Sequence, residues 1–307
     1  MCGLRFAITW LGCVLLSSTL NGQGIVHVED TTAAPSFLHE TAAEQGASRW
    51  SLLSRVEATY LKLEPFNDVA TENVVLDLQP APRLTLGFLR DDGWGIQSRY
   101  WQYATDFDAQ LIEPNLALIQ VDVGLDLYYV DLEAVRMVQG RRWGLQATFG
   151  GRHASIERRV VGVAMLTDAG NVLVGAANQT DGFFGGGLTG SLEFTRSLGD
   201  SPWQLFANCR GSALWGRESR HATGANINNG VLVSFSESSD VSATQAGLES
   251  QLGLQWSHDL HYLHGTLVCR TAVEYQLWNT SPEGVAANNR VPDVELYGVA
   301  WSIGFTH

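Results

Sequence analysis

The chain has 307 residues, a formal net charge of −13 and 45% hydrophobic residues. Its mean hydropathy of −0.02 excludes a helical membrane protein, and its acidity argues against a nucleic-acid partner because phosphate binding needs a basic surface. The 32 glycines, against only 8 prolines, are typical of many strands joined by tight turns.

The N-terminus predicts an export signal. Arg5 supplies a positive charge, and the apolar run 6–20 has the length of a signal-peptide core but is too short to cross a bilayer as a helix. The next stretch is polar and shows no periodicity. We therefore predict a signal peptide over 1–22, a flexible periplasmic tail over 23–49 and a strand-rich domain over 50–307.

The strand-rich domain begins with three predicted strands, over 50–63, 83–90 and 94–103. Apolar and polar residues alternate in each, although extra aromatic residues blur the alternation in the third. A period of two places the apolar set on one face of a sheet. The sequence Asp91-Asp92-Gly93 between the second and third strands predicts a hairpin turn.

The fourth predicted strand, over 116–138, changes parity in its middle. Apolar residues occupy odd positions up to Leu127 and even positions from Val130 onward. A β-bulge would produce this change, because one extra residue moves every later side chain to the other face. We therefore expect a bulge near Tyr128-Tyr129.

Six more predicted strands follow, and short turns alternate with longer connections along the whole chain. The strands cover 143–156, 182–197, 203–216, 244–256, 263–278 and 297–305. The longer connections, which we predict to be external loops, are 64–80, 104–115, 157–181, 217–241 and 279–293. With an even strand number, both termini then lie on the short-turn side, as in outer-membrane barrels. A sandwich with Greek-key crossings would not alternate so regularly.

Aromatic residues recur beside the turns. Several tryptophans open a strand directly after a short turn, which predicts an aromatic girdle at one rim: Trp94, Trp143 and Trp203. A second girdle is predicted near the opposite strand ends: Tyr60, Trp215, Tyr275 and Trp278. The predicted fold is therefore all-β, a closed antiparallel transmembrane β-barrel of about ten strands (roughly 8–12) with up-and-down topology.

The polar face of such a barrel lines its lumen. Ten charged residues are predicted to project there: Arg55, Glu57, Asp122, Asp126, Arg152, Glu193, Arg210, Glu249, Arg270 and Glu274. We expect them either to line a water channel, where fixed charge biases which ions pass, or to form salt bridges that close the lumen.

Other motifs point only weakly to chemistry. Residues 185–190 match G-x-G-x-x-G but lie inside an alternating strand, whereas that motif must open a helix; the glycines there are expected to relieve crowding. His258, His261 and His264 could bind zinc or copper, although turn histidines without further ligands are commonly solvated. We therefore predict no catalytic residue, no metal, no cofactor and no enzymatic activity.

Four short stretches resemble a known family. They are the aromatic strand Arg99–Tyr103, the hairpin Asp92-Gly93-Trp94, the strand Val130–Ala134 and the strand Phe149–Arg152. Together they resemble the Legionella major-outer-membrane-protein-like family of pore-forming barrels, most closely over about 80–155. The resemblance implies a pore or an adhesin-like surface role and carries over no catalytic residues.

The combined prediction is a porin-like protein of the cell outer membrane that lets small hydrophilic solutes or ions diffuse passively. Its expected partners are outer-membrane lipid, those solutes and the barrel-assembly machinery. Two alternatives remain open. One is a closed structural barrel whose loops bind a surface partner, and the other is a secreted soluble β-sandwich that acts as a binding module.

Overall fold

The computed structural model describes residues 50–63, 77–113, 117–166, 172–228, 231–282 and 293–307. The predicted signal peptide (1–22) and periplasmic tail (23–49) lie outside the described residues. In the part of the chain that the structure describes, no helix has the length and apolar character needed to cross a membrane.

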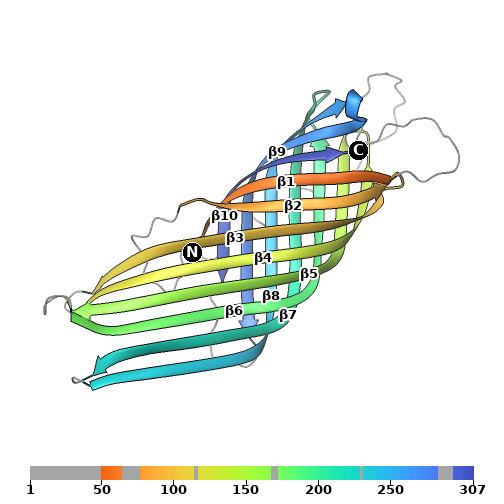
Figure 1. Ribbon diagram of the computed structural model, residues 1–307. Coiled ribbons are helices and arrows are strands. Elements are labelled where there is room, and N and C mark those ends of the chain that lie inside the picture. Colours follow the sequence, from red (N-terminus) through yellow and green to blue (C-terminus); the bar gives the residue numbers. More distant parts are fainter. Residues whose placement is uncertain (1–49, 64–76, 114–116, 167–171, 229–230, 283–292) are drawn as a thin grey trace, which may run out of the picture. The chain divides into compact units, whose positions relative to one another are not determined.

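The described chain folds into ten antiparallel strands that close into a barrel (Figure 1). The strands are β1 (Trp50–Leu63), β2 (Gln79–Arg90), β3 (Trp94–Glu113), β4 (Ala117–Gln139), β5 (Trp143–Leu166), β6 (Val172–Ser197), β7 (Trp203–Asn228), β8 (Val231–Leu260), β9 (Gly265–Pro282) and β10 (Val294–Thr306). Each strand pairs with its neighbours in chain order, and β1 pairs with β10. This arrangement confirms the predicted up-and-down barrel and rules out the sandwich.

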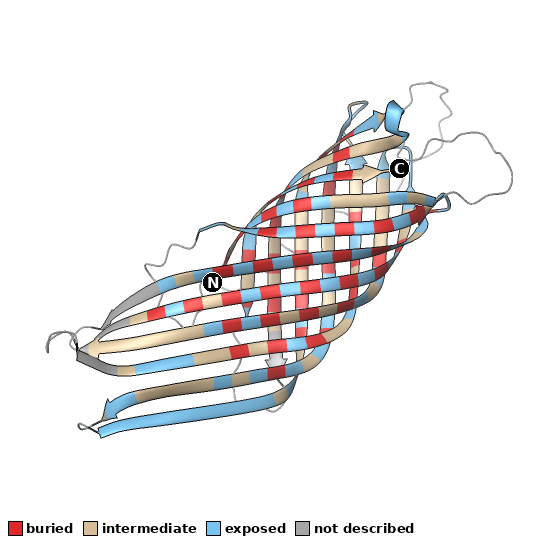
Figure 2. Ribbon diagram, in the orientation of Figure 1, coloured by how far each residue is buried: buried red, intermediate tan, exposed pale blue. Residues whose placement is uncertain are grey.

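The strands form because their side chains alternate between two environments, as the buried and exposed residues along each ribbon show (Figure 2). At the closure, β1 and β10 pair continuously from Leu53 opposite Thr306 to Leu63 opposite Leu296. Along this seam Val56 and Trp301 are exposed, whereas Glu57 and Ser302 are buried. The predicted alternation therefore gives the correct inner and outer faces of both closing strands.

Tight turns join the strands at the end of the barrel where β1 begins and β10 ends. Gly93 (φ 83°) and Gly199 (φ 67°) adopt the left-handed conformation that glycine tolerates best. A short 3₁₀ turn, His261–Leu263, connects β8 to β9, and His264 follows it with φ 47°. Three of the four short connections lie where the sequence predicts them. The fourth, predicted at 257–262, begins only after Leu260, because β8 continues to that residue.

The opposite end of the barrel differs from the prediction. Most of the expected loops 104–115, 157–181 and 217–241 is strand, because β3 to β8 continue well past the outer ends of β1 and β2 (Figure 1). Backbone pairing between β7 and β8, for example, continues as far as Asn228 opposite Val231. The loop prediction was wrong because backbone hydrogen bonds hold neighbouring strands together whether or not their outer face is apolar.

The expected bulge in β4 is also absent. Tyr129 lies opposite Trp101 on β3 and opposite Ala154 on β5, and the pairing continues unshifted on both sides of it. Odd residues of β4 therefore face the interior from Val121 to Val135. The apparent parity change arises because both surroundings change polarity at the same height. Leu127 is buried inside the barrel, while Asp126 is exposed on its outside.

Candidate functional site: a closed lumen and a projecting sheet

Ion pairs fill the half of the barrel interior that lies nearer the short turns. Within the described residues, six carboxylates and six guanidiniums meet there, and we call them the lumen ion-pair network. Its members are Glu57, Asp131, Glu133, Glu193, Glu249, Glu274, Arg55, Arg83, Arg99, Arg152, Arg210 and Arg270. Nine of the ten strands contribute, so the network crosses the barrel rather than following its wall.

The network centres on Glu249 and Arg152, which lie on β8 and β5. Glu249 oxygens lie 2.7 Å from Arg152 Nη2 and 2.8 Å from Arg99 Nη2, and Tyr129 Oη donates a hydrogen bond to the same carboxylate at 2.9 Å. Arg152 also donates to both oxygens of Asp131, at 2.7 and 2.9 Å. The guanidinium of Arg152 is fully buried and lies 3.8 Å from the centroid of the Tyr129 ring.

Further pairs extend this centre toward the walls. Arg83 pairs with Glu57 and donates to Glu274 Oε1 at 2.6 Å. Arg210 pairs with Glu133 on the opposite side of the interior. Every one of these carboxylates thus contacts at least one arginine, which offsets the large cost of burying charge.

A smaller group lies nearer the short turns. Arg270 donates two hydrogen bonds to Glu193, at 2.6 and 2.9 Å, and Arg55 Nη1 lies 3.8 Å from the same carboxylate. The space enclosed between these residues and the main network measures about 20 Å³, roughly the room of one water molecule. Side chains therefore fill this level of the lumen.

The ten residues predicted to line the lumen divide into two groups. Eight lie inside the barrel as members of the network: Arg55, Glu57, Arg152, Glu193, Arg210, Glu249, Arg270 and Glu274. The other two, Asp122 and Asp126, are exposed on the outer face of β4, so their predicted position was wrong. The error follows from the expected bulge, which would turn the even-numbered residues before Tyr128 toward the interior. The strand has no bulge, so these residues face outward.

Four members of the network were missed in the sequence. Arg99 lies in the aromatic-rich third predicted strand, where the alternation is blurred. Arg83 is the first residue of the second predicted strand, and Asp131 and Glu133 follow the expected bulge. A signal was present for Arg83, because it precedes the exposed Leu84 in a clear alternation. Charge at an odd position of β2 could therefore have been assigned to the interior.

An apolar layer closes the interior directly beyond the network. Its buried side chains form one cluster, which we call the inner apolar layer: Leu61, Leu63, Ala81, Trp101, Tyr103, Val121, Val123, Leu125, Leu127, Tyr129, Ala154, Ile156, Phe183, Leu214, Ala243, Trp278, Val294 and Leu296. The Tyr129 ring stacks on Trp101, with 5.1 Å between centroids, and lies 5.9 Å from Trp278. Trp278 was predicted in an outer girdle and instead lies inside, 1% exposed.

The outside of the barrel around the network is apolar. Large exposed hydrophobic residues form a continuous band on all ten strands, among them Val56, Leu84, Ile96, Leu132, Phe149, Leu188, Leu205, Leu254, Val273 and Ile303. On β4 the band runs from Tyr128 to Val138, which is about the 9–11 residues that a tilted transmembrane strand needs. Trp94, Trp143 and Trp203 are exposed at its short-turn rim, as predicted. The fold is that of a transmembrane β-barrel.

Beyond the band, the extended parts of β3 to β8 form what we call the projecting sheet: 102–113, 117–127, 155–166, 172–182, 217–228 and 231–242. Its outer face carries polar residues such as Asp106, Asp126 and Arg217. Its inner face continues the inner apolar layer and then holds further charged residues. Arg220 Nε donates to Asp181 at 2.8 Å there, and Arg158 and Glu218 are buried nearby on the same face. The projecting sheet is therefore arranged like part of a water-soluble protein.

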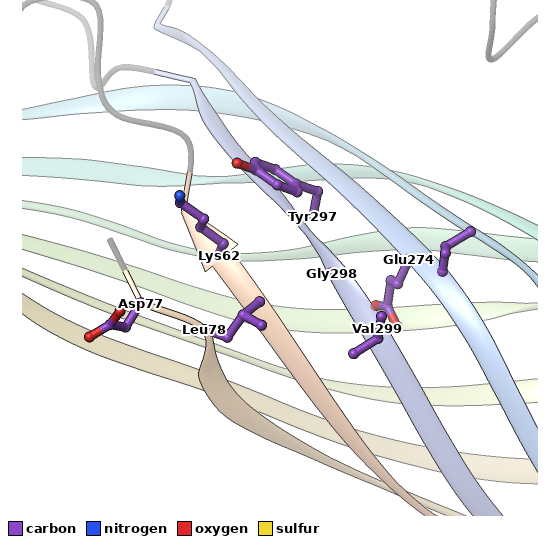
Figure 3. Close-up of a pocket in the computed structure, with 8 residues that line it drawn as sticks. Lys62, Asp77, Leu78, Glu274, Tyr297, Gly298 and Val299 are labelled. Carbon is purple, nitrogen blue, oxygen red and sulfur yellow. The ribbon is translucent and has the colours of Figure 1, made fainter. Parts of the chain in front are cut away.

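A shallow hollow lies on the outside of the barrel at the outer ends of β1, β9 and β10 (Figure 3). It measures about 630 Å³, and Lys62, the single lysine of the chain, borders it next to Tyr297. Aromatic rings and a long basic side chain at this height are typical of the interface between lipid tails and headgroups. This hollow is thus part of the lipid-facing surface.

The remaining motifs carry no site in the described structure. The glycines of 185–190 lie in β6, and a side chain on Gly185 or Gly187 would meet the β7 backbone at 2.6 or 2.1 Å, so they permit close strand approach. His258, His261 and His264 are all exposed. Among the described residues, no group of three or more histidine, cysteine or acidic side chains is placed to hold a metal ion.

Comparison with known proteins finds no matching family model and no matching curated protein. The chain is similar to solved barrel structures. The outer membrane protease OmpT from Escherichia coli shares 9% identity at a TM-score of 0.39, covering 87% of this chain and 99% of that one. The attachment invasion locus protein Ail of Yersinia pestis shares 12% at 0.28 (84% and 98%), and Neisserial surface protein A shares 11% at 0.32 (85% and 98%). At this identity the likeness concerns the fold alone, and the resemblance to the Legionella family stays a prediction.

Proposed function

We propose that this protein is an outer-membrane barrel that is closed to solutes and that presents the projecting sheet at the cell surface for binding. The observation that carries this proposal is the closure of the interior at two successive levels, first by the lumen ion-pair network and then by the inner apolar layer. A solute would have to disrupt both levels. The proposed role includes no chemical step.

The orientation supports a binding role outside the cell. In outer-membrane barrels the short turns face the periplasm and the longer connections face outward. The four short turns and both ends of the barrel domain lie on one side, so the projecting sheet extends from the other. A sheet with a polar outer face suits an aqueous surface better than a membrane.

A second candidate is the porin-like diffusion predicted from the sequence. It is favoured by the polar interior around Glu193, where the side chains of Arg270 and Arg55 are 12% and 22% exposed. Opening would require at least the separation of Arg210 from Glu133 or of Arg152 from Asp131 and Glu249. Breaking a buried pair is costly, about 3–5 kcal/mol when one partner is removed, so an open state would be rare without a trigger.

Single-channel conductance in a planar bilayer tests the two candidates. Heat-modifiable migration on a gel first shows that the refolded barrel is intact. We expect the wild-type protein to insert and stay silent. Discrete conductance steps in the wild type would overturn the closed-barrel proposal and favour the porin-like one. In that case, neutralising Arg210 or Arg270 should shift the ion preference, whereas neutralising the exposed Arg142 should leave it unchanged.

A further inference from the structure

Among the described strands, one edge of the projecting sheet is open. β8 pairs with β7 from Val231 onward but with β9 only from Ala243, so residues 231–242 have a hydrogen-bonded neighbour on one side alone among the described strands. Ten consecutive residues of this segment, 231–240, are exposed on both faces of the strand. An open strand edge offers unpaired backbone N–H and C=O groups that can pair with another extended chain.

The side chains of this edge divide into an apolar half and an acidic half. At the tip, Val231, Leu232, Val233 and Phe235 are 62%, 70%, 47% and 49% exposed. Toward the barrel come Glu237 and Asp240, and the segment 231–242 contains no lysine, arginine or proline. Charged residues, lysine above all, and proline are common devices that keep strand edges from pairing; here the charges are only the two acids, which a basic partner strand would neutralise. Exposed apolar residues in a cluster mark an interaction surface.

A second copy of this chain does not fit the edge. In antiparallel self-pairing about the middle of 231–242, Val233 would lie opposite Asp240, and Val231 and Phe235 would lie opposite serines, so most apolar residues of one copy would meet polar residues of the other. The other open edge of the projecting sheet, on β3 beyond its last pairing with β2 at Trp101, carries the exposed Asp106 and Asp108. Like charges opposite each other destabilise strand pairs. The two edges of the sheet therefore repel each other, within one molecule or between two.

We propose that the edge of β8 over Val231–Ser242 captures an extended segment of another protein as an added strand, and that this segment carries apolar residues in one half and basic residues in the other. The apolar half covers Val231 to Phe235, and the basic half lies beside Glu237 and Asp240. This inference rests on the proposed binding function and names its surface and the chemistry of its partner.

A synthetic peptide of the same length as 231–242 serves as the probe, with consecutive lysines in one half, so that both faces of the strand carry positive charge, and Val-Thr repeats in the other. It is made in both orders, because added strands can run parallel or antiparallel. Binding to the folded barrel in detergent is measured by fluorescence anisotropy. Replacing both Glu237→Lys and Asp240→Lys should weaken binding about tenfold or more, as two attractive cross-strand pairs become repulsive. The same variant should gain affinity for a peptide with Glu in place of Lys.

The matched control reverses two other exposed acids of the projecting sheet, Asp126→Lys and Glu157→Lys. These residues lie opposite each other on β4 and β5, in the middle of the sheet, so the net charge changes equally but the open edge does not. The control should bind the basic peptide as the wild type does. Equal weakening in both variants would show nonspecific charge attraction and overturn the proposal.

Backbone pairing is tested separately with N-methylated peptides. Methyl groups on every second amide should abolish binding when those amides face β8 and should be tolerated when the alternate set is methylated, because successive N–H groups of a strand point in opposite directions. Equal effects of the two peptides would overturn strand addition. Absence of peptide binding by a barrel that is silent in the bilayer would overturn this inference alone and leave the closed-barrel proposal intact.

Discussion

The membrane-spanning part of this barrel and its projecting sheet are built from the same strands with opposite arrangements of polarity. On β4, Leu132 faces lipid and Asp131 faces the interior, whereas a few residues earlier Asp126 faces outward and Leu125 faces inward. The backbone register does not change between them. Because the pleat is continuous, the same alternate residues face outward on both sides of the polarity change. These outward residues are apolar where they meet lipid and polar where they meet water, and the inward residues have the opposite polarity.

This difference has an energetic consequence for the two interiors. In a barrel whose apolar residues face lipid, the alternate, polar side chains face the interior. They must pair with one another because the interior excludes water. The projecting sheet contacts water outside and can fill its interior with apolar residues in the ordinary way. The spanning interior is therefore held mainly by specific ion pairs, whereas the projecting interior combines nonpolar packing with a few buried charged residues, among them Arg158, Asp181 and Glu218.

The largest expected effect comes from breaking an ion pair in the spanning part. Arg152→Leu removes the guanidinium that binds both Asp131 and Glu249 at 2.7 Å. Arg99 and Arg210 stay near these two carboxylates. We expect a loss of about 3–5 kcal/mol in the free energy of unfolding, because the buried network is left with one more carboxylate than guanidinium. Urea unfolding in lipid vesicles, followed by tryptophan fluorescence, measures it.

A control for this variant is available at a turn. Arg142→Leu removes an exposed pair with Asp200, in which the side chains are 60% and 74% exposed and 3.5 Å apart. Exposed pairs contribute about 0–1 kcal/mol, so this change should be nearly neutral. If Arg152→Leu were equally neutral, water would be reaching the network and the closed interior would be disproved.

The next effect concerns the apolar interior beyond the network. Leu125 is 1% exposed within the inner apolar layer, so Leu125→Ala should destabilise the protein by about 2–5 kcal/mol through lost contacts and a residual cavity. The neighbouring Asp126→Ala, on the exposed face of the same strand, should change stability by about 0.5 kcal/mol or less. Equilibrium unfolding under the same conditions compares them, and a similar small effect of both would mean that the layer is not packed.

The sequence predicts the spanning part well and the projecting sheet poorly. In β9, Cys269 and Val273 alternate with Arg270 and Glu274 as the structure requires, because one face meets lipid and the other meets a charged interior. That contrast is strong enough to assign both faces from residue type. It also identifies most of the lumen ion-pair network, although the choice of partners across the barrel depends on closure and cannot be deduced from one strand.

The projecting sheet gives a different signal. Its reversed pattern on β4 predicts a bulge at Tyr128-Tyr129 that the strand does not have, because a change in parity has two possible causes, an extra residue or a change of solvent. A single strand cannot distinguish them. The prediction of a loop over 231–240 has another cause. This segment pairs with β7 but is exposed on both faces, so its apolar and polar residues need not alternate.

The smallest of the three stability effects tests the boundary between the two parts directly. Leu132→Arg and Asp126→Arg place the same side chain on the same outer face of β4, on opposite sides of the polarity change. Arginine in the lipid-facing band should cost about 2–4 kcal/mol near the bilayer midplane, and less if Leu132 lies nearer an interface. The substitution at Asp126 should cost about 0.5 kcal/mol or less, because that residue already contacts water. Unfolding in vesicles measures both. Equal costs would place both residues in one environment, and the parity change on β4 would then need a cause other than the membrane surface.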